Sequence, residues 1–167
     1  FIASASFVYI GAVGLSATEF SLAFAVNAIG FFVASQFSAP LAIRLGTLRM
    51  IGLATIGFAV STFAGFSLAL VGLASLPVTM SALFVGNMFL GVILPTAQVQ
   101  ALEEHGDIAG LASSLGGTIQ MLAAGVLVAA AGPFLDGTVV PMLGAIALCG
   151  GIALILSLII PREAAVA

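Results

Sequence analysis

Residues 50–72 read MIGLATIGFAVSTFAGFSLALVG, a continuous apolar stretch without a charged side chain. An α-helix rises 1.5 Å per residue, so this stretch is about 35 Å long as a helix, enough to cross a bilayer core of about 30 Å. A charged side chain at the centre of such a span costs about 2.5–3.5 kcal/mol on insertion scales. The stretch therefore predicts a transmembrane helix.

Similar apolar runs recur along the chain, and short polar or proline-containing joints separate them. They cover residues 20–43, 78–102, 108–131 and 139–160, and residues 1–14 form a shorter run that we expect to be a truncated first span. Every charged residue lies in a joint or at an end of a run. The runs are too long for barrel strands, which need about 9–11 residues. We therefore predict one all-α membrane domain over residues 1–167.

Composition agrees with a membrane location. Hydrophobic residues make up 62% of the 167 residues and charged residues only 5%, against about 25% charged in soluble domains. The net charge is −3, with three arginines and no lysine, so nothing is basic enough to indicate a nucleic-acid partner. The expected partner is the lipid bilayer.

The three arginines predict the orientation. Arg44 and Arg49 follow the run 20–43, and Arg162 follows the run 139–160. These positions share one side of the membrane if every run crosses it. Cytoplasmic loops carry an excess of basic residues, so we predict that this side is cytoplasmic.

Amide side chains lie at depth in three of the runs. An amide in hydrocarbon needs a partner or water, so it faces other helices or a wet cavity. At helical spacing, aromatic residues share faces with several of these amides, which is typical of a site for a mostly apolar ligand with a polar group. The residues expected to line such a cavity are Phe24, Asn27, Phe31, Phe84, Asn87 and Gln120. The alternative is that each amide bonds a neighbouring helix.

Small residues and one proline mark how the helices pack and bend. Four small residues recur at every fourth position of one run and predict close helix packing: Gly57, Ser61, Gly65 and Ala69. Pro95 interrupts the hydrogen bonding of its run, one turn after Gly91. We expect a bend there, serving either as a hinge or as a fixed packing kink.

The sequence contains no arrangement typical of an enzyme. There is no Ser–His–Asp set, no P-loop and no pair of acids within a run. The single histidine, His105, follows Glu103 and Glu104 in a joint and favours a solvated loop over a metal site. We predict no enzymatic activity, no cofactor and no metal. A proton-coupled carrier needs a titratable group at depth, and this chain would have to obtain it from elsewhere.

Several motifs resemble a known family. The most specific stretch is residues 109–117, AGLASSLGG, followed by Gln120; Gly91 with Pro95 and the segment 136–138 add to it. With these motifs the chain resembles the C-terminal half, spans seven to twelve, of a Major Facilitator transporter. Within that superfamily it is most similar to the bicyclomycin-resistance (Bcr/CflA) branch of drug:proton antiporters.

The resemblance implies a six-helix half-bundle built as a 3+3 inverted repeat in the bacterial inner membrane. It implies efflux of small amphipathic drugs, with protons carried by the missing N-terminal half. The family's switch motif reads Gly-x-x-x-Asp-Arg-x-Gly-Arg, and here Arg44 and Gly46 match it. Ile43 replaces the Asp and Thr47 the final Arg. Arg44, Gly46, Gly91 and Pro95 are the expected conformational residues.

Two other functions are compatible with the sequence. One is a self-contained six-span carrier or channel that works as an oligomer. The other is a membrane scaffold subunit that transports nothing. The scaffold predicts that the amides are all paired between helices, whereas a transporter predicts a polar cavity open to one side of the membrane.

Overall fold

The computed structural model describes residues 14–73, 75–103, 106–134 and 138–159. The expected truncated span, residues 1–14, lies outside the described residues except for Gly14. In the described part of the chain all regular structure is helical, as predicted. The α-helices are α2 (Ala17–Gln36), α3 (Ser38–Leu45), α4 (Thr47–Leu70), α5 (Leu76–Glu103), α6 (Ala109–Ala131) and α7 (Val139–Ile159). Two 3-10 turns, η2 (Gly106–Ile108) and η3 (Gly132–Phe134), flank α6.

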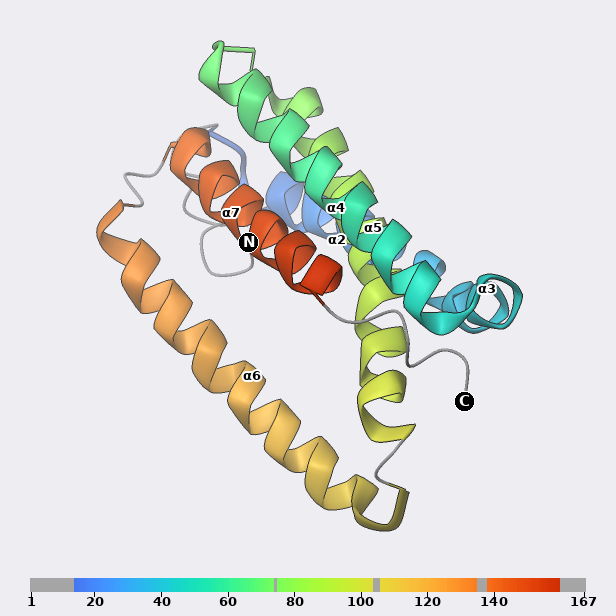
Figure 1. Cartoon of the computed structure of the whole chain (residues 1–167). Coiled ribbons are helices and arrows are strands. Elements are labelled where there is room, and N and C mark those ends of the chain that lie inside the picture. Colours follow the sequence, from blue (N-terminus) through green and yellow to red (C-terminus); the bar gives the residue numbers. More distant parts are fainter. Residues whose placement is uncertain (1–13, 74, 104–105, 135–137, 160–167) are drawn as a thin grey trace.

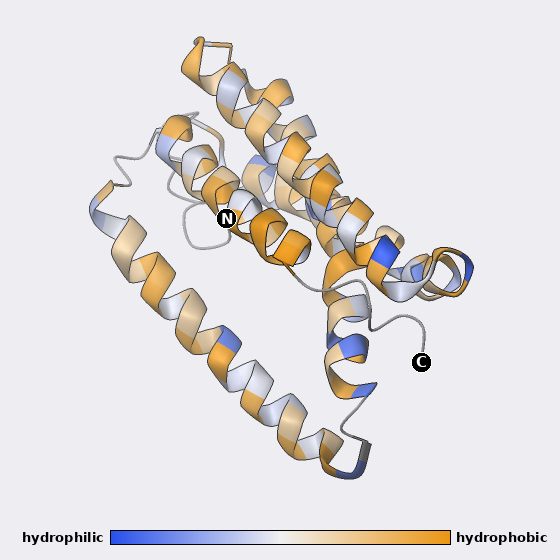
Figure 2. Ribbon diagram, viewed as in Figure 1, coloured by the Kyte–Doolittle hydropathy of each residue, from blue (hydrophilic) through white to orange (hydrophobic). Residues whose placement is uncertain are grey.

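Five of these helices are long and apolar enough to cross a membrane. They are α2, α4, α5, α6 extended by η3, and α7. Figure 2 shows that apolar residues cover most of each helix. Large apolar side chains lie on the outer surface, including Ile29, Val60 and Leu158, as expected of helices that face lipid. The chain is a multi-span membrane protein.

Four of the long helices form one bundle, and α6 lies apart from them. α4 packs against α5 on one side and α7 on the other, while α2 packs against α5. Figure 1 shows α6 running beside this bundle, joined to it at its two ends. The buried apolar cluster of the bundle comprises Ala69, Leu83, Met142 and Leu143. α6 contributes no buried residue.

A capping box starts α2. The Ser16 hydroxyl accepts a hydrogen bond from the Glu19 N–H at 3.3 Å, and the Glu19 carboxylate accepts one from the Ser16 N–H at 2.9 Å. These two bonds satisfy backbone donors that a helix start leaves unpaired. Ser16 is therefore the N-cap of α2.

The run 20–43 is divided into two helices. α2 ends at Gln36, and α3 begins at Ser38. Pro40 explains the division because it has no N–H to donate to the Gln36 carbonyl, and its ring would clash with that carbonyl in a continuous helix. In the first turn of α3 neither penalty applies, since an N–H there has no helical partner.

A glycine joins α3 to α4. Gly46 has a φ of 80°, in the left-handed region where residues with a Cβ are strained. This conformation lets α4 start immediately at Thr47 and turn back along the bundle. The role of Gly46 is therefore to adopt the positive φ that the junction between α3 and α4 requires.

α5 continues through Pro95 as one helix of 28 residues. Pro95 leaves the Gly91 carbonyl without its usual helical donor. Figure 1 shows α5 changing direction in its C-terminal half, the bend that a proline within a helix predicts.

Glycines of α4 and α7 lie against aromatic rings of the neighbouring helices. A Cβ added at Gly57 would meet the ring of Phe89, and one added at Gly144 would lie 3.0 Å from the ring of Phe66. A Cβ added at Gly65 would lie 2.9 Å from the Cβ of Ala82. The small-residue stripe of α4 thus packs directly on α5, as its spacing predicts.

Candidate functional site

Two asparagines join α2 to α5. The Asn87 side-chain N–H donates to the Asn27 side-chain oxygen at 3.0 Å, and the Asn27 side-chain N–H donates to the Ala23 carbonyl at 3.0 Å. Asn27 is 3% exposed, whereas Asn87 is only half-buried. The first bond is therefore a link between helices, and the second is a local bond along α2.

Both asparagines lie towards the middle of helices long enough to span a bilayer. Water is scarce at that depth, so a buried amide without a partner would lose several kcal/mol. Measured hydrogen bonds between membrane helices average about 0.6 kcal/mol and reach about 1.7. The pair thus stabilises the contact modestly and fixes how α2 is rotated against α5.

Close backbone approach surrounds the amide pair. A Cβ added at Gly30 on α2 would lie 2.5 Å from the ring of Phe84 on α5. A Cβ added at Gly91 on α5 would meet the carbonyl group of Phe31 on α2. We call the contact formed by Asn27, Gly30, Phe31, Phe84, Asn87 and Gly91 the amide seam.

The predicted aromatic residues differ in their exposure. Phe31 and Phe84 are half-buried within the amide seam. Phe24 lies about one turn before Asn27 and is 37% exposed, with its ring centroid 6.1 Å from that of Phe20. The seam therefore presents rings and a partly exposed amide together on the surface of α2 and α5.

Gln120 is separate from the other predicted cavity residues. It lies on α6, where Gln120 and all its neighbours from Ser113 to Ala130 are exposed. α6 runs apart from the bundle in Figure 1. The structure thus brings Asn27, Phe31, Phe84 and Asn87 together and leaves Gln120 outside that group.

The four predicted conformational residues occupy different places. Gly91 belongs to the amide seam, and Pro95 lies one turn further along α5. Arg44 is exposed in the last turn of α3, and Gly46 is the junction that follows. Gly91 is held against backbone, whereas Gly46 has open space around it.

Gly30 is a seam residue that the sequence pattern did not single out. Its position three residues after Asn27, which places the two residues next to each other on one side of the helix, was the available signal. Thr79, outside the seam, is a second buried polar residue that the sequence pattern did not indicate. It is 2% exposed, and its hydroxyl has no hydrogen-bond partner among the described residues.

The amide seam can bind a ligand only through uncharged groups. None of its six residues is titratable, so the seam itself offers hydrogen bonds and ring surfaces and no proton transfer. Within the described residues, the Asn87 side-chain oxygen accepts no hydrogen bond. That oxygen is available to a ligand that carries a donor.

Comparison of the chain with protein-family models, curated proteins and solved structures finds no match.

Proposed function

We propose that this chain forms part of a membrane transporter for small, mostly apolar molecules that carry a hydrogen-bond donor. The supporting observation is the amide seam, where Asn87 is only half-buried and its side-chain oxygen accepts no hydrogen bond from the described residues. The ring of Phe84, one turn earlier on α5, belongs to the same seam. Ligand sites are mainly apolar with a few placed polar groups. The seam has this composition at the depth where carriers bind their substrates.

The polar residues of α6 supply further support. Ser113, Thr118 and Gln120 are exposed, and the hydroxyl of Thr118 donates to the Ser114 carbonyl of its own helix. An amide such as Gln120 is unfavourable in contact with lipid tails. A water-filled cavity beside α6 would satisfy it, so we propose that α6 forms a second wall of the substrate cavity.

We infer a more specific assignment from the sequence motifs. In this proposal the chain is the C-terminal half of a drug:proton antiporter of the Major Facilitator type, arranged as a 3+3 inverted repeat. The residues that support it are the stretch 109–117 and Gln120. Because the amide seam contains no acid, the proton would bind in the other half.

Gly91 and Pro95 suggest how such a cavity would open. Pro95 weakens α5 directly after the point where Gly91 contacts the Phe31 backbone. A helix bends more easily where one of its hydrogen bonds is missing. We propose that α5 changes its bend at this point while the amide seam stays closed.

An efflux assay on the complete gene product tests the proposed cavity. Asn87→Ala removes the exposed acceptor, and we expect a several-fold change in efflux of donor-bearing substrates with normal amounts of protein in the membrane. Ser81→Ala is the matched control, since Ser81 is exposed on the same helix and its hydroxyl bonds no described residue except Val78, through its carbonyl. Unchanged efflux of every substrate by Asn87→Ala would exclude the seam as a substrate site.

One observation favours a scaffold that transports nothing. Asn27 and Asn87 bond each other, as a purely structural role for the amides predicts. A scaffold predicts that Asn27→Ala and Asn87→Ala both lower stability and that neither alters the movement of any solute. The same efflux assay, combined with unfolding measurements on the purified variants, separates the two functions.

A further inference from the structure

We propose that α3 and the first turn of α4 bind the headgroups of anionic phospholipids at the membrane surface. The surface in question, called here the interfacial surface, consists of Phe37, Leu41, Ile43, Arg44, Leu45 and Arg49. All six side chains are exposed. This inference concerns a different end of the molecule from the amide seam and does not depend on transport.

Helix lengths place α3 outside the bilayer core. α2 has 20 residues, about 30 Å at 1.5 Å per residue, which already equals the thickness of the core. α4 has 24 residues and is about 36 Å long, so its first turn also extends beyond the core. Since α3 joins these two helices, it lies at the level of the lipid headgroups.

Apolar side chains are exposed at this level. Ile43 is 86% exposed and Phe37 is 56% exposed. The face of α3 that packs on the protein carries small residues instead, with Ser38 buried and Ala42 half-buried. An apolar outer face beside basic residues is typical of helices that lie in the membrane interface.

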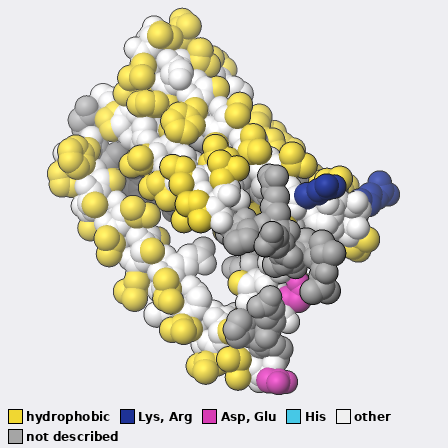
Figure 3. Space-filling view, in the orientation of Figure 1, with side chains coloured by type: hydrophobic (Ala, Val, Ile, Leu, Met, Phe, Trp, Pro, Cys, Tyr) yellow, Lys and Arg dark blue, Asp and Glu magenta, His cyan; other side chains and the backbone are white. Residues whose placement is uncertain are grey.

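Two arginines, Arg44 and Arg49, lie next to this apolar face. Among the described residues, neither Arg44 nor Arg49 forms an ion pair. Figure 3 shows the basic side chains together at one edge of the molecule, at the end where α3 lies. A pair of unpartnered guanidinium groups is complementary to phosphate.

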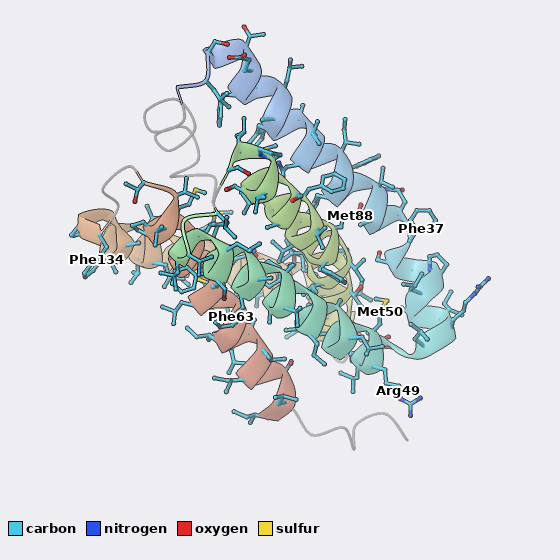
Figure 4. All side chains as sticks on the ribbon, turned by 90° about the horizontal axis from the view of Figure 1, so that it is seen from above. Phe37, Arg49, Met50, Phe63, Met88 and Phe134 are labelled. Atoms are coloured by element: carbon cyan, nitrogen blue, oxygen red, sulfur yellow. The ribbon has the colours of Figure 1, made fainter. Side chains whose placement is uncertain are left out.

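The position of Arg49 argues against a role within the protein. Arg49 lies in the first turn of α4, where the helix dipole is unfavourable for a cation by about 0.3–1 kcal/mol. Figure 4 shows its side chain pointing away from the helices. An anionic group outside the protein would offset this repulsion, and the membrane surface supplies one at this depth.

Hydrogen–deuterium exchange on the full chain in lipid nanodiscs tests the proposal. Each arginine near an anionic surface contributes about 1 kcal/mol, so two strengthen the contact roughly thirty-fold. We therefore expect backbone exchange over residues 38–49 to be several-fold slower, and at most about thirty-fold slower, in discs with phosphatidylglycerol than in discs of phosphatidylcholine alone. The turn between α4 and α5, which carries no basic residue, serves as the internal control and should exchange equally in both.

Two variants and one ligand control complete the test. Arg44→Gln with Arg49→Gln should abolish the lipid effect, and Arg44→Lys with Arg49→Lys should retain most of it because the charges remain. Inorganic phosphate added to phosphatidylcholine discs should slow nothing. Equal slowing in the glutamine variant, equal slowing by inorganic phosphate, or no difference between the two lipids would each overturn the proposal. If the glutamine variant fails to fold, the proposal is still tested by comparing the exchange of the parent protein and the lysine variant in the two kinds of disc.

Discussion

The side-chain amide of Asn87 on α5 donates a 3.0 Å hydrogen bond to the side-chain oxygen of Asn27, 60 residues earlier on α2. Asn27 in turn donates to the Ala23 carbonyl on its own helix. The Asn27 side chain is almost fully buried, and both of its polar atoms have hydrogen-bond partners inside the protein. The two helices are thereby connected by a specific polar contact.

A double-mutant cycle should measure this contact. Asn27→Ala and Asn87→Ala together are expected to show a coupling free energy of about 0.6–1.7 kcal/mol, the range for hydrogen bonds between membrane helices. The measurement is reversible unfolding of the purified protein in mixed detergent micelles. Asn27→Ala combined with Ser81→Ala is the control cycle, and its coupling should be near zero because no hydrogen bond joins those residues. Equal coupling in both cycles would contradict the bond.

Substitution of Gly91 should be strongly unfavourable. Gly91→Ala places a methyl group against the Phe31 carbonyl, and overpacking against backbone destabilises by about 1–3 kcal/mol. Gly52→Ala is the matched control because Gly52 also lies within a helix but has open space around it. The control should be neutral or stabilising by up to about 1 kcal/mol. Unfolding midpoints that fall equally for both variants would show that the close contact is absent.

The contact between Gly57 and Phe89 should show compensation. Gly57→Ala is expected to destabilise because the new Cβ meets the phenyl ring, by about 1–3 kcal/mol. Phe89→Leu provides space, so the double variant should be more stable than the sum of the two single effects predicts. Strict additivity in the unfolding free energies would mean that the ring does not lie on this glycine.

The junction at Gly46 should depend on backbone conformation alone. Gly46→Ala meets no neighbouring atom, yet the φ of 80° makes it unfavourable by about 1–2 kcal/mol. Gly125→Ala in α6 also meets no neighbouring atom and serves as the control, expected to be neutral or stabilising. The measurement is the free energy of unfolding of each variant in mixed detergent micelles. A Gly46→Ala variant as stable as the parent protein would exclude the left-handed junction.

Much of the helical architecture followed from the apolar runs. A helix that faces lipid does not need a polar side, so its sequence is apolar all round. The length of each apolar run and the positions of the charged residues therefore indicate most of each span. The run 139–160 corresponds to α7 at Val139–Ile159, and the run 50–72 to α4 at Thr47–Leu70. The exception was the run 20–43, where hydropathy does not register the helix break that Pro40 causes.

The candidate site was less accessible to sequence reasoning. Helical spacing indicated that Asn27 and Asn87 face inwards, but their pairing depends on how α2 and α5 are rotated and offset against each other. The sequence also placed Gln120 with these residues, whereas α6 lies apart from the bundle. Helix faces are local properties, while the choice of partner for each face is set by the whole bundle.

The contacts between glycines and phenyl rings limit how this chain can evolve. At Gly57 any larger residue meets the ring of Phe89, and at Phe89 any smaller residue leaves a void in the interface. Neither position can drift alone without loss of stability. Exposed positions such as Val60 and Leu158 carry no such constraint and can exchange with other apolar residues. Related chains are expected to differ most where they face lipid and to change these paired positions only together.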